Sequence, residues 1–214
     1  MSNNSPTARL DLFATPVLKV IVQDAPALNA RLKKLIYAQE ANNDGLQKSN
    51  QGGWHSKDDM MSWAPEEAKI LLNAAMGACA PHTADTHPSG KRNFEFNANM
   101  WANINRRGHA NKAHTHPGCL WSCAYYVDDG IDGDSGTAAG ELMLEDPRYP
   151  MNAMYIPSLV LRSGDGTPQH SQYAVTPKSG LMVIFPSWLR HSVRPYHGDK
   201  DRISVAFNLM VKEA

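Results

Sequence analysis

The sequence lacks an excess of charge of either sign. Its 214 residues contain 21 Lys and Arg residues and 21 Asp and Glu residues, so the formal net charge at pH 7 is zero. A protein that binds nucleic acid or an anionic membrane surface by electrostatic attraction needs a basic patch or stripe. We therefore expect neither nucleic acid nor a membrane as a partner.

Long apolar runs are missing as well. No segment approaches the roughly 18 consecutive apolar residues that a membrane-spanning helix needs. Residues 1–9 are largely polar and lack the apolar core of a secretory signal. We therefore expect a cytoplasmic protein.

Cysteine is scarce, with only Cys79, Cys119 and Cys123 in the chain. An odd number of cysteines does not form a closed disulfide framework. Cys119 and Cys123 lie four residues apart on a predicted strand, where neighbours on one face are too far apart to be bridged easily. We predict reduced, buried thiols.

The first 92 residues predict two helices joined by a polar loop. Asp24 and Pro26 supply a cap and a first-turn proline for a helix that ends near Ala41. A second helix, rich in Ala, Leu and Met, is predicted from about Pro65 to Ala80. The loop between them, Asn42 to Ser56, holds too many glycine and polar residues to predict regular structure. One face of the first helix is apolar through Leu28, Leu32, Leu35 and Ile36.

From residue 94 onward the hydrophobic pattern changes to a period of two, which is typical of strands. In the first of these strands Phe94, Phe96, Ala98 and Met100 alternate with a polar face. Further strands are predicted at Leu120–Val127, Glu141–Glu145, Met154–Leu161, Gln172–Val175, Leu181–Phe185, Ser192–Arg194 and from Arg202 onward.

These strands are enough for two facing sheets. A chain of this length can bury one sizeable core. We predict a mainly β fold in a single domain of residues 1–214, in which residues 1–92 give helical and loop support and residues 93–214 form the β core.

The last strand carries an arginine on its polar face. Ile203, Val205, Phe207 and Leu209 share one face, whereas Arg202, Ser204, Ala206 and Asn208 share the other. A buried arginine needs an anion, which can be a ligand. The alternative is a structural salt bridge to Asp128, Asp129 or Asp146.

Three histidines precede this arginine in an order that suggests a metal site. His114 and His116 stand one residue apart at the start of a predicted strand, and His191 stands where a strand restarts after a proline-containing turn. Arg202 follows eleven residues later. A His-x-His pair alone is weak evidence, because exposed or hydrogen-bonded histidines are common. Its place upstream of His191 and Arg202 strengthens the metal interpretation.

In this order the segments resemble a family of 2-oxoglutarate- and iron(II)-dependent oxygenases related to prolyl hydroxylases. The resemblance covers nearly the whole chain. The segments that carry it are Leu12-Phe13-Ala14-Thr15-Pro16, Gly52-Gly53-Trp54-His55-Ser56, Trp101-Ala102-Asn103-Ile104-Asn105, His114-Thr115-His116-Pro117, Tyr125-Tyr126-Val127, Phe185-Pro186-Ser187 to His191, and Arg202-Ile203-Ser204.

The resemblance implies a double-stranded β-helix, the jelly-roll barrel of cupin-like proteins, with the N-terminal helices packed on one sheet. It also implies iron(II), 2-oxoglutarate as co-substrate, and dioxygen. The implied reaction is hydroxylation of a substrate, which the sequence does not identify, with release of succinate and carbon dioxide.

The ligand set implied by the resemblance is His114, His116 and His191. Iron(II) that activates oxygen needs a few firm ligands on one side and open positions on the other. The wider superfamily usually has an aspartate or glutamate where this chain has His116, so the identity of the third ligand stays open. His109, in a turn rich in glycine and asparagine, is the alternative.

Five residues are candidates for binding 2-oxoglutarate. Arg202 would take the distal carboxylate with its two-pronged guanidinium, and Ser204 on the same strand face would add a hydroxyl. Tyr126 resembles a co-substrate-binding tyrosine of prolyl hydroxylases. Asn103 and Asn105 could reach the proximal carboxylate or a substrate.

Two other functions are compatible with these residues. The first is a three-histidine, cupin-like dioxygenase that binds its substrate directly to iron and needs no 2-oxoglutarate; Arg202 and Ser204 weigh against it. The second is a non-catalytic, metal-binding jelly-roll module, which a zinc-filled site without an open position would favour.

Overall fold

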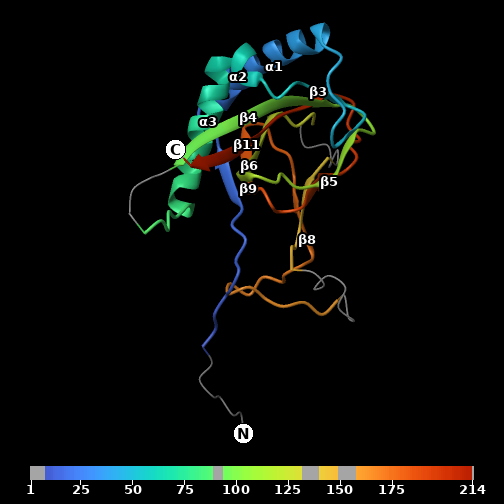
Figure 1. Cartoon of the computed structure of the whole chain (residues 1–214). Coiled ribbons are helices and arrows are strands. Elements are labelled where there is room, and N and C mark those ends of the chain that lie inside the picture. Colours follow the sequence, from blue (N-terminus) through green and yellow to red (C-terminus); the bar gives the residue numbers. More distant parts are fainter. Residues whose placement is uncertain (1–7, 89–93, 132–139, 149–157, 214) are drawn as a thin grey trace.

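The protein is built around two facing antiparallel sheets. The computed structural model describes residues 8–88, 94–131, 140–148 and 158–213 (Figure 1). Its elements in chain order are β1 (Leu18–Ile21), α1 (Ala25–Asn42), β2 (Asn50–Gln51), β3 (Trp54–His55), α2 (Met60–Trp63), α3 (Pro65–Cys79), the short 3-10 helix η1 (Ala80–His82), β4 (Phe94–Asn105), β5 (Ala110–His114), β6 (Cys119–Asp128), β7 (Leu142–Glu145), β8 (Gln172–Val175), β9 (Leu181–Pro186), β10 (His191–Val193) and β11 (Arg202–Glu213).

One sheet has six strands in the order β1-β9-β6-β11-β4-β3, and the other has five in the order β2-β5-β10-β7-β8. Strands that follow one another in sequence from β4 onward often lie in different sheets, as in a jelly roll. The predicted double-stranded β-helix is confirmed. Strands β1, β2 and β3, all from the first 92 residues, extend the two sheets, whereas the domain division at residue 92 stays a prediction.

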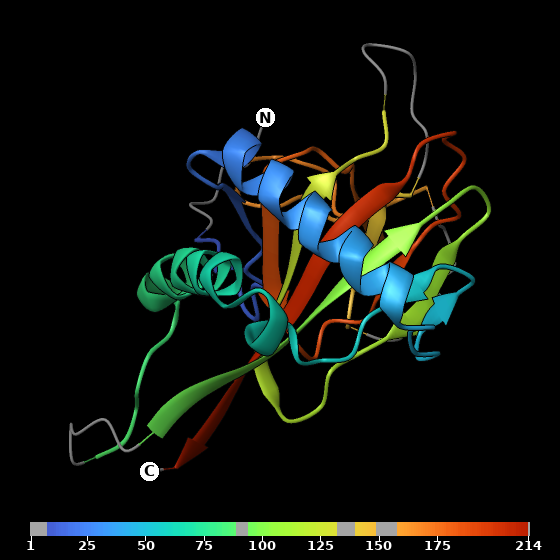
Figure 2. The same cartoon turned by 90° about the horizontal axis from the view of Figure 1, so that it is seen from above.

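The helices cover the outer face of the six-stranded sheet (Figures 1 and 2). In α1, Leu28, Leu32 and Ile36 are buried, as the apolar face of this helix predicts. They belong to one apolar cluster with Leu71 of α3 and with the outward-facing residues of β4, β6 and β11. On β11 these outward residues are Ile203, Val205, Phe207 and Leu209.

A second, smaller apolar cluster lies between the two sheets. It contains Tyr126 of β6, Leu144 of β7 and Phe185 of β9. Because neighbouring residues of a strand point to opposite faces, the polar residues Arg202, Ser204 and Asn208 of β11 point to this interior side. All three are buried. The six-stranded sheet therefore has an apolar face under the helices and a partly polar face inside the barrel.

Three details differ from the sequence predictions. The loop Asn42–Ser56 contains two short strands, β2 and β3, which pair with β5 and β4. Asp24 stands at the N-cap position of α1, but its backbone is left-handed (φ 51°) and its side chain makes no capping hydrogen bond. The predicted strand Met154–Leu161 lies partly outside the described residues, and residues 158–161 are not in a strand.

The three cysteines are free thiols, as predicted. Cys79 and Cys123 are buried, whereas Cys119 is only half-buried. In the described ranges, no helix combines the length and the apolar character needed to cross a membrane.

Candidate active site

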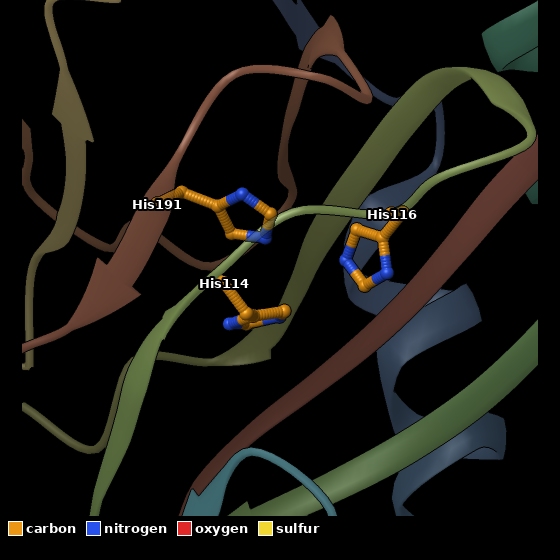
Figure 3. A group of neighbouring side chains, drawn as sticks. All are labelled: His114, His116 and His191. Atoms are coloured by element: carbon orange, nitrogen blue, oxygen red, sulfur yellow. The ribbon is translucent and has the colours of Figure 1, made fainter.

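The five-stranded sheet brings three histidines together at the end of two paired strands. His114 ends β5 and His191 begins β10, and the two are direct partners in the antiparallel register. His116 lies in the turn that follows β5, where its backbone N–H donates to the carbonyl of Ser187 at 2.9 Å. The possible ligand atoms of the three rings all lie within 4.8 Å of one another, and the rings face a common centre (Figure 3).

Backbone carbonyls orient two of the three rings. Nδ1 of His114 lies 2.7 Å from the carbonyl oxygen of Lys112, and Nδ1 of His191 lies 2.8 Å from that of Leu189. A carbonyl oxygen only accepts, so each Nδ1 carries the proton and donates it. This leaves the lone pair on Nε2, as in metal-binding histidines whose second nitrogen is hydrogen-bonded to the protein.

All three imidazoles are held in the neutral form that a metal needs. Burial, together with the neighbouring imidazoles, lowers the pKa of His116 to about 4 and that of His191 to about 3. Burial also lowers the pKa of His114. At neutral pH the three rings are therefore unprotonated, so a divalent cation would not have to compete with protons for them.

Aromatic side chains pack around the cluster. The ring of Phe185 contacts that of His191 edge-on, with 4.7 Å between their centroids. The indole of Trp101 lies 6.0 Å from the ring of His116 and stacks on His55 at 5.4 Å. The sequence pattern did not predict that these rings surround the histidines.

His109, the alternative third ligand, lies outside the cluster. Its Nδ1 accepts the backbone N–H of Arg106 at 2.9 Å. Its ring packs so closely on Gly52 that a Cβ at this glycine would lie 2.5 Å from the ring carbon Cδ2. Gly52 and Gly53 both have positive φ, which explains why two glycines stand here. His109 therefore has a structural contact of its own.

Arg202 is buried inside the barrel, with 2 % of its surface exposed. Nη1 lies 3.4 Å from Oδ1 of Asn105, and Nε has no hydrogen-bond partner in the part of the chain that the structure describes. Among the residues described, the three aspartates considered as salt-bridge partners are engaged elsewhere. Asp128 pairs with a lysine of α1, Asp146 with the arginine two residues later, and Asp129 accepts backbone N–H groups. None of these aspartates therefore neutralises the guanidinium, and burial lowers the pKa of Arg202.

The four other candidates share the interior face with Arg202. Ser204 is the partner of both Tyr126 and Asn103 in the sheet register, and Asn105 is the partner of Arg202. The guanidinium carbon of Arg202 lies 5.2 Å from the centroid of the Tyr126 ring, over its face. Within the described residues the buried hydroxyl of Tyr126 has no hydrogen-bond partner, and burial, opposed by the charge of Arg202, raises the pKa of Tyr126. The structure thus brings together all five residues proposed for the co-substrate.

Gly140 packs against Arg202 in the candidate site and was not predicted from the sequence. Its φ is +76°, and a Cβ there would lie 3.2 Å from Cδ of Arg202 and 3.2 Å from Cδ2 of Tyr196. Only glycine combines this backbone conformation with such a close approach. The signal in the sequence, one glycine in a Gly- and Ala-containing segment, was too common to be informative.

A family comparison agrees with this geometry. Residues 99–208 match the family described as "Putative 2OG-Fe(II) oxygenase". The matched segment begins on β4, ends on β11 and includes the three histidines and Arg202. No curated protein sequence matches the chain.

Solved structures with the same fold include several oxygenases. A prolyl-4-hydroxylase of Pseudomonas putida is 13% identical, with a TM-score of 0.56 and 91% of each chain covered. A prolyl hydroxylase of Trichoplax adhaerens, in complex with a peptide of hypoxia inducible factor, is 12% identical, with a TM-score of 0.59 and 91% of this chain and 83% of that chain covered. HygX of Streptomyces hygroscopicus, with nickel, 2-oxoglutarate and hygromycin B bound, is 12% identical, with a TM-score of 0.58 and coverages of 92% and 83%.

Proposed function

Because the chain belongs to the family of 2-oxoglutarate- and iron(II)-dependent oxygenases, we propose that it hydroxylates its substrate at a carbon–hydrogen bond. Dioxygen supplies one oxygen atom to the new hydroxyl group and the other to succinate, and the first carboxyl group of 2-oxoglutarate leaves as carbon dioxide. Iron(II), when bound, supplies the redox chemistry.

His114, His116 and His191 are the proposed metal ligands. Their neutral rings, convergent ligand atoms and hydrogen-bonded Nδ1 atoms fit a divalent transition metal. Three imidazoles bring no negative charge, unlike a set with one carboxylate. The site should therefore depend more on an anionic co-substrate to balance the metal charge.

Arg202 is the observation that carries the proposal. Only 2 % of the surface of Arg202 is exposed, and its guanidinium has no carboxylate partner among the described residues. Burying such a charge costs free energy unless a ligand supplies the anion. The distal carboxylate of 2-oxoglutarate fits this requirement, since it can accept two parallel hydrogen bonds. Ser204 and Tyr126 would each add a hydroxyl.

Two small residues on the interior face, Ala124 and Ala206, are only half-buried. Ala206 lies four residues after Arg202 on β11, which is roughly 13 Å in an extended strand. It pairs with Ala124 on one side and with Trp101 on the other. The small side chains of Ala206 and Ala124 lie side by side, and we call this pair the alanine floor. Trp101, the neighbour of Ala206, lies beside the ring of His116. We propose that 2-oxoglutarate lies over this floor, with Asn103 and Asn105 along its edge.

The test is binding of 2-oxoglutarate to the iron-loaded protein under anaerobic conditions, followed by the visible charge-transfer absorption of the complex. We expect absorption only when iron(II) and 2-oxoglutarate are both present. Arg202→Leu should weaken 2-oxoglutarate binding by about 100-fold, because it removes charge-assisted hydrogen bonds in a buried site. Arg202→Lys should be almost as weak, since an ammonium cannot reproduce the two-pronged contact.

Arg194→Leu is the matched control, because Arg194 is exposed and lies just beyond β10. An unchanged dissociation constant in Arg202→Leu would remove 2-oxoglutarate from the proposal. It would favour the three-histidine dioxygenase that binds substrate directly to iron.

A further inference from the structure

Three uncharged polar side chains form a ledge on the interior face of the six-stranded sheet, at the opposite end from Arg202. They are Asn99 of β4, Asn208 of β11 and Ser122 of β6, and they form one cross-strand row because Asn208 is paired with both Asn99 and Ser122. No part of the proposed iron and 2-oxoglutarate chemistry uses them. We call this row the Asn99–Asn208–Ser122 ledge.

The ledge points into the barrel. Phe207 and Leu209, on either side of Asn208, belong to the apolar cluster under the helices. Trp121 and Cys123, on either side of Ser122, belong to the same cluster. Since side chains alternate along a strand, Asn208 and Ser122 face the interior. Both have only 2 % of their surface exposed.

Two aromatic contacts place the ledge beside the histidine cluster. Phe185 is the partner of Ser122 in the neighbouring strand, and its ring contacts that of His191. Trp101, two residues from Asn99 on the same strand face, lies beside His116. The row is thus flanked by the rings that touch two of the three histidines, on the far side of the alanine floor from Arg202.

The hydrogen bonding of the ledge is incomplete. Ser122 Oγ donates to Oδ1 of Asn208 at 2.7 Å, which orients that carboxamide. Oδ1 of Asn99 is buried and has no hydrogen-bond partner among the residues that the structure describes. The hydroxyl of Ser187, fully buried just after β9, also lacks a partner within the described ranges. Buried polar atoms without partners are rare, because each costs free energy unless a ligand or water satisfies it.

We propose that this ledge binds the primary substrate through an uncharged amide group next to the carbon that is hydroxylated. A carboxamide offers both a donor and an acceptor, so a pair of them is complementary to an amide, and the oxygen of Asn99 can accept a hydrogen bond from the amide N–H. None of the three ledge residues is charged, so a carboxylate or an ammonium group at this position would lose its hydration without gaining a counter-ion. Asn99 and Asn208 contact the substrate, and Ser122 positions Asn208. This inference rests on the proposed function.

The test uses three probes with one skeleton, of which only the first has an amide: N-methylpropanamide (the methylamide), methyl propanoate (the ester) and propanoic acid (the free acid). Each is titrated into the anaerobic complex of the full chain with iron(II) and 2-oxoglutarate, and the shift of its visible absorption is measured. We expect the methylamide to bind about tenfold more tightly than the ester, since one neutral hydrogen bond separates them. The free acid should bind more weakly than the methylamide.

Variants assign the preference to the ledge. Asn99→Leu should abolish the amide-over-ester preference while leaving the melting temperature unchanged, because its oxygen makes no hydrogen bond within the described residues. A merely structural role would instead lower the melting temperature and leave the preference intact. Ser122→Ala should reduce the preference less than Asn208→Leu does. Asn97→Leu is the matched control, an exposed residue two positions earlier on β4.

The outcomes separate this inference from the proposed function. If the wild-type protein fails to bind iron(II) or 2-oxoglutarate, the proposed function itself is wrong. If both bind but the methylamide and the ester have equal affinities, or if Asn99→Leu keeps the preference, the ledge is not the amide-binding site. Tighter binding of the free acid would likewise overturn it.

Discussion

At the scale of single residues, the metal site depends on three rings supplied by two short strands and a turn. We predict that His191→Ala lowers the affinity for iron(II) by at least about 100-fold. Even a residue that only hydrogen-bonds to a metal ligand typically changes metal affinity by about 10–100-fold when it is substituted, and a direct ligand should matter more. Iron content per chain after anaerobic loading measures this. The fold should persist, since His191 is a small part of the interior.

His109→Ala is the control for His191→Ala. It removes an imidazole that packs on Gly52 and lies outside the cluster, so iron content should stay near that of the wild-type protein. His116→Asp should also bind iron, because a carboxylate is an alternative ligand at this position. Loss of iron in both His109→Ala and His116→Asp would show that the ligand set is different.

Gly140 gives a second prediction at this scale. Gly140→Ala should weaken 2-oxoglutarate binding by about tenfold, because its Cβ would push against the Arg202 side chain and shift the guanidinium by a fraction of an ångström. Isothermal titration with the manganese-loaded protein can measure this without turnover.

Gly166→Ala separates the steric effect from the backbone effect. Gly166 also has positive φ (+87°), but a Cβ there would meet no atom of the described residues within 4 Å. Both variants should lose about 1–2 kcal/mol of stability from the left-handed backbone. Equal 2-oxoglutarate affinity in the two variants would contradict a role for Gly140 in placing Arg202.

At the scale of elements, an ion-pair network joins α1 to the start of β11. Arg106, just after β4, pairs with Glu40 of α1 and with Asp201, which directly precedes Arg202. Tyr37 donates to Asp201 at 3.2 Å, and burial with this carboxylate raises the pKa of Tyr37 to about 12. The network holds the Arg202 end of β11 against the helix layer.

Arg106→Met should lower the free energy of unfolding by up to about 1 kcal/mol, because the arginine is partly exposed and water screens its ion pairs. Urea denaturation at low and high salt measures the change, which should shrink at high salt. Arg107→Met is the control, since the one ion pair of Arg107 among the described residues is with the highly exposed Asp199. A loss in Arg106→Met that is independent of salt would point to packing instead.

The sequence patterns predicted the long elements well and the short ones poorly. The strands β4, β6 and β11 have 10 to 12 residues, enough for the alternation of apolar and polar side chains to be visible. The strands β2 and β3 have two residues each, so no periodicity exists, and their extended form comes from pairing with β5 and β4.

The same limit applies to the candidate site. Alternation along one strand shows which residues share a face, so Arg202 and Ser204 could be grouped from the sequence. It does not show which side chain of the other sheet lies opposite. The contact between Phe185 and His191, and with it the position of the Asn99–Asn208–Ser122 ledge beside the histidines, depends on how two sheets face each other.

At the scale of the whole molecule, the buried histidines make the metal-free protein sensitive to acid. The pKa values of His116 (about 4) and His191 (about 3) lie below the ordinary value of 6.5. Between pH 6.5 and pH 4 these two histidines bind more protons in the unfolded chain than in the folded chain. Stability therefore falls as pH decreases from about 6.5 toward 4, and it does not fall on this account above 6.5.

Each of these histidines should contribute up to about 1.4 kcal/mol per pH unit within that window. Denaturant unfolding of the metal-free protein at pH 7, 6 and 5 measures the slope, and His191→Gln should reduce it. A slope that His191→Gln leaves unchanged would mean that this ring is not held neutral in the folded protein.

The main-chain anchoring of His114 and His191 has a consequence for how this barrel can change. The backbone carbonyls of Lys112 and Leu189 hold the two rings. Every residue type has the same backbone carbonyl, whatever its side chain. Substitution of nearby side chains therefore does not remove these anchors. The interior residues beside the histidines are free to vary in chemistry while metal binding persists, so new substrate preferences can arise by single substitutions without rebuilding the metal centre.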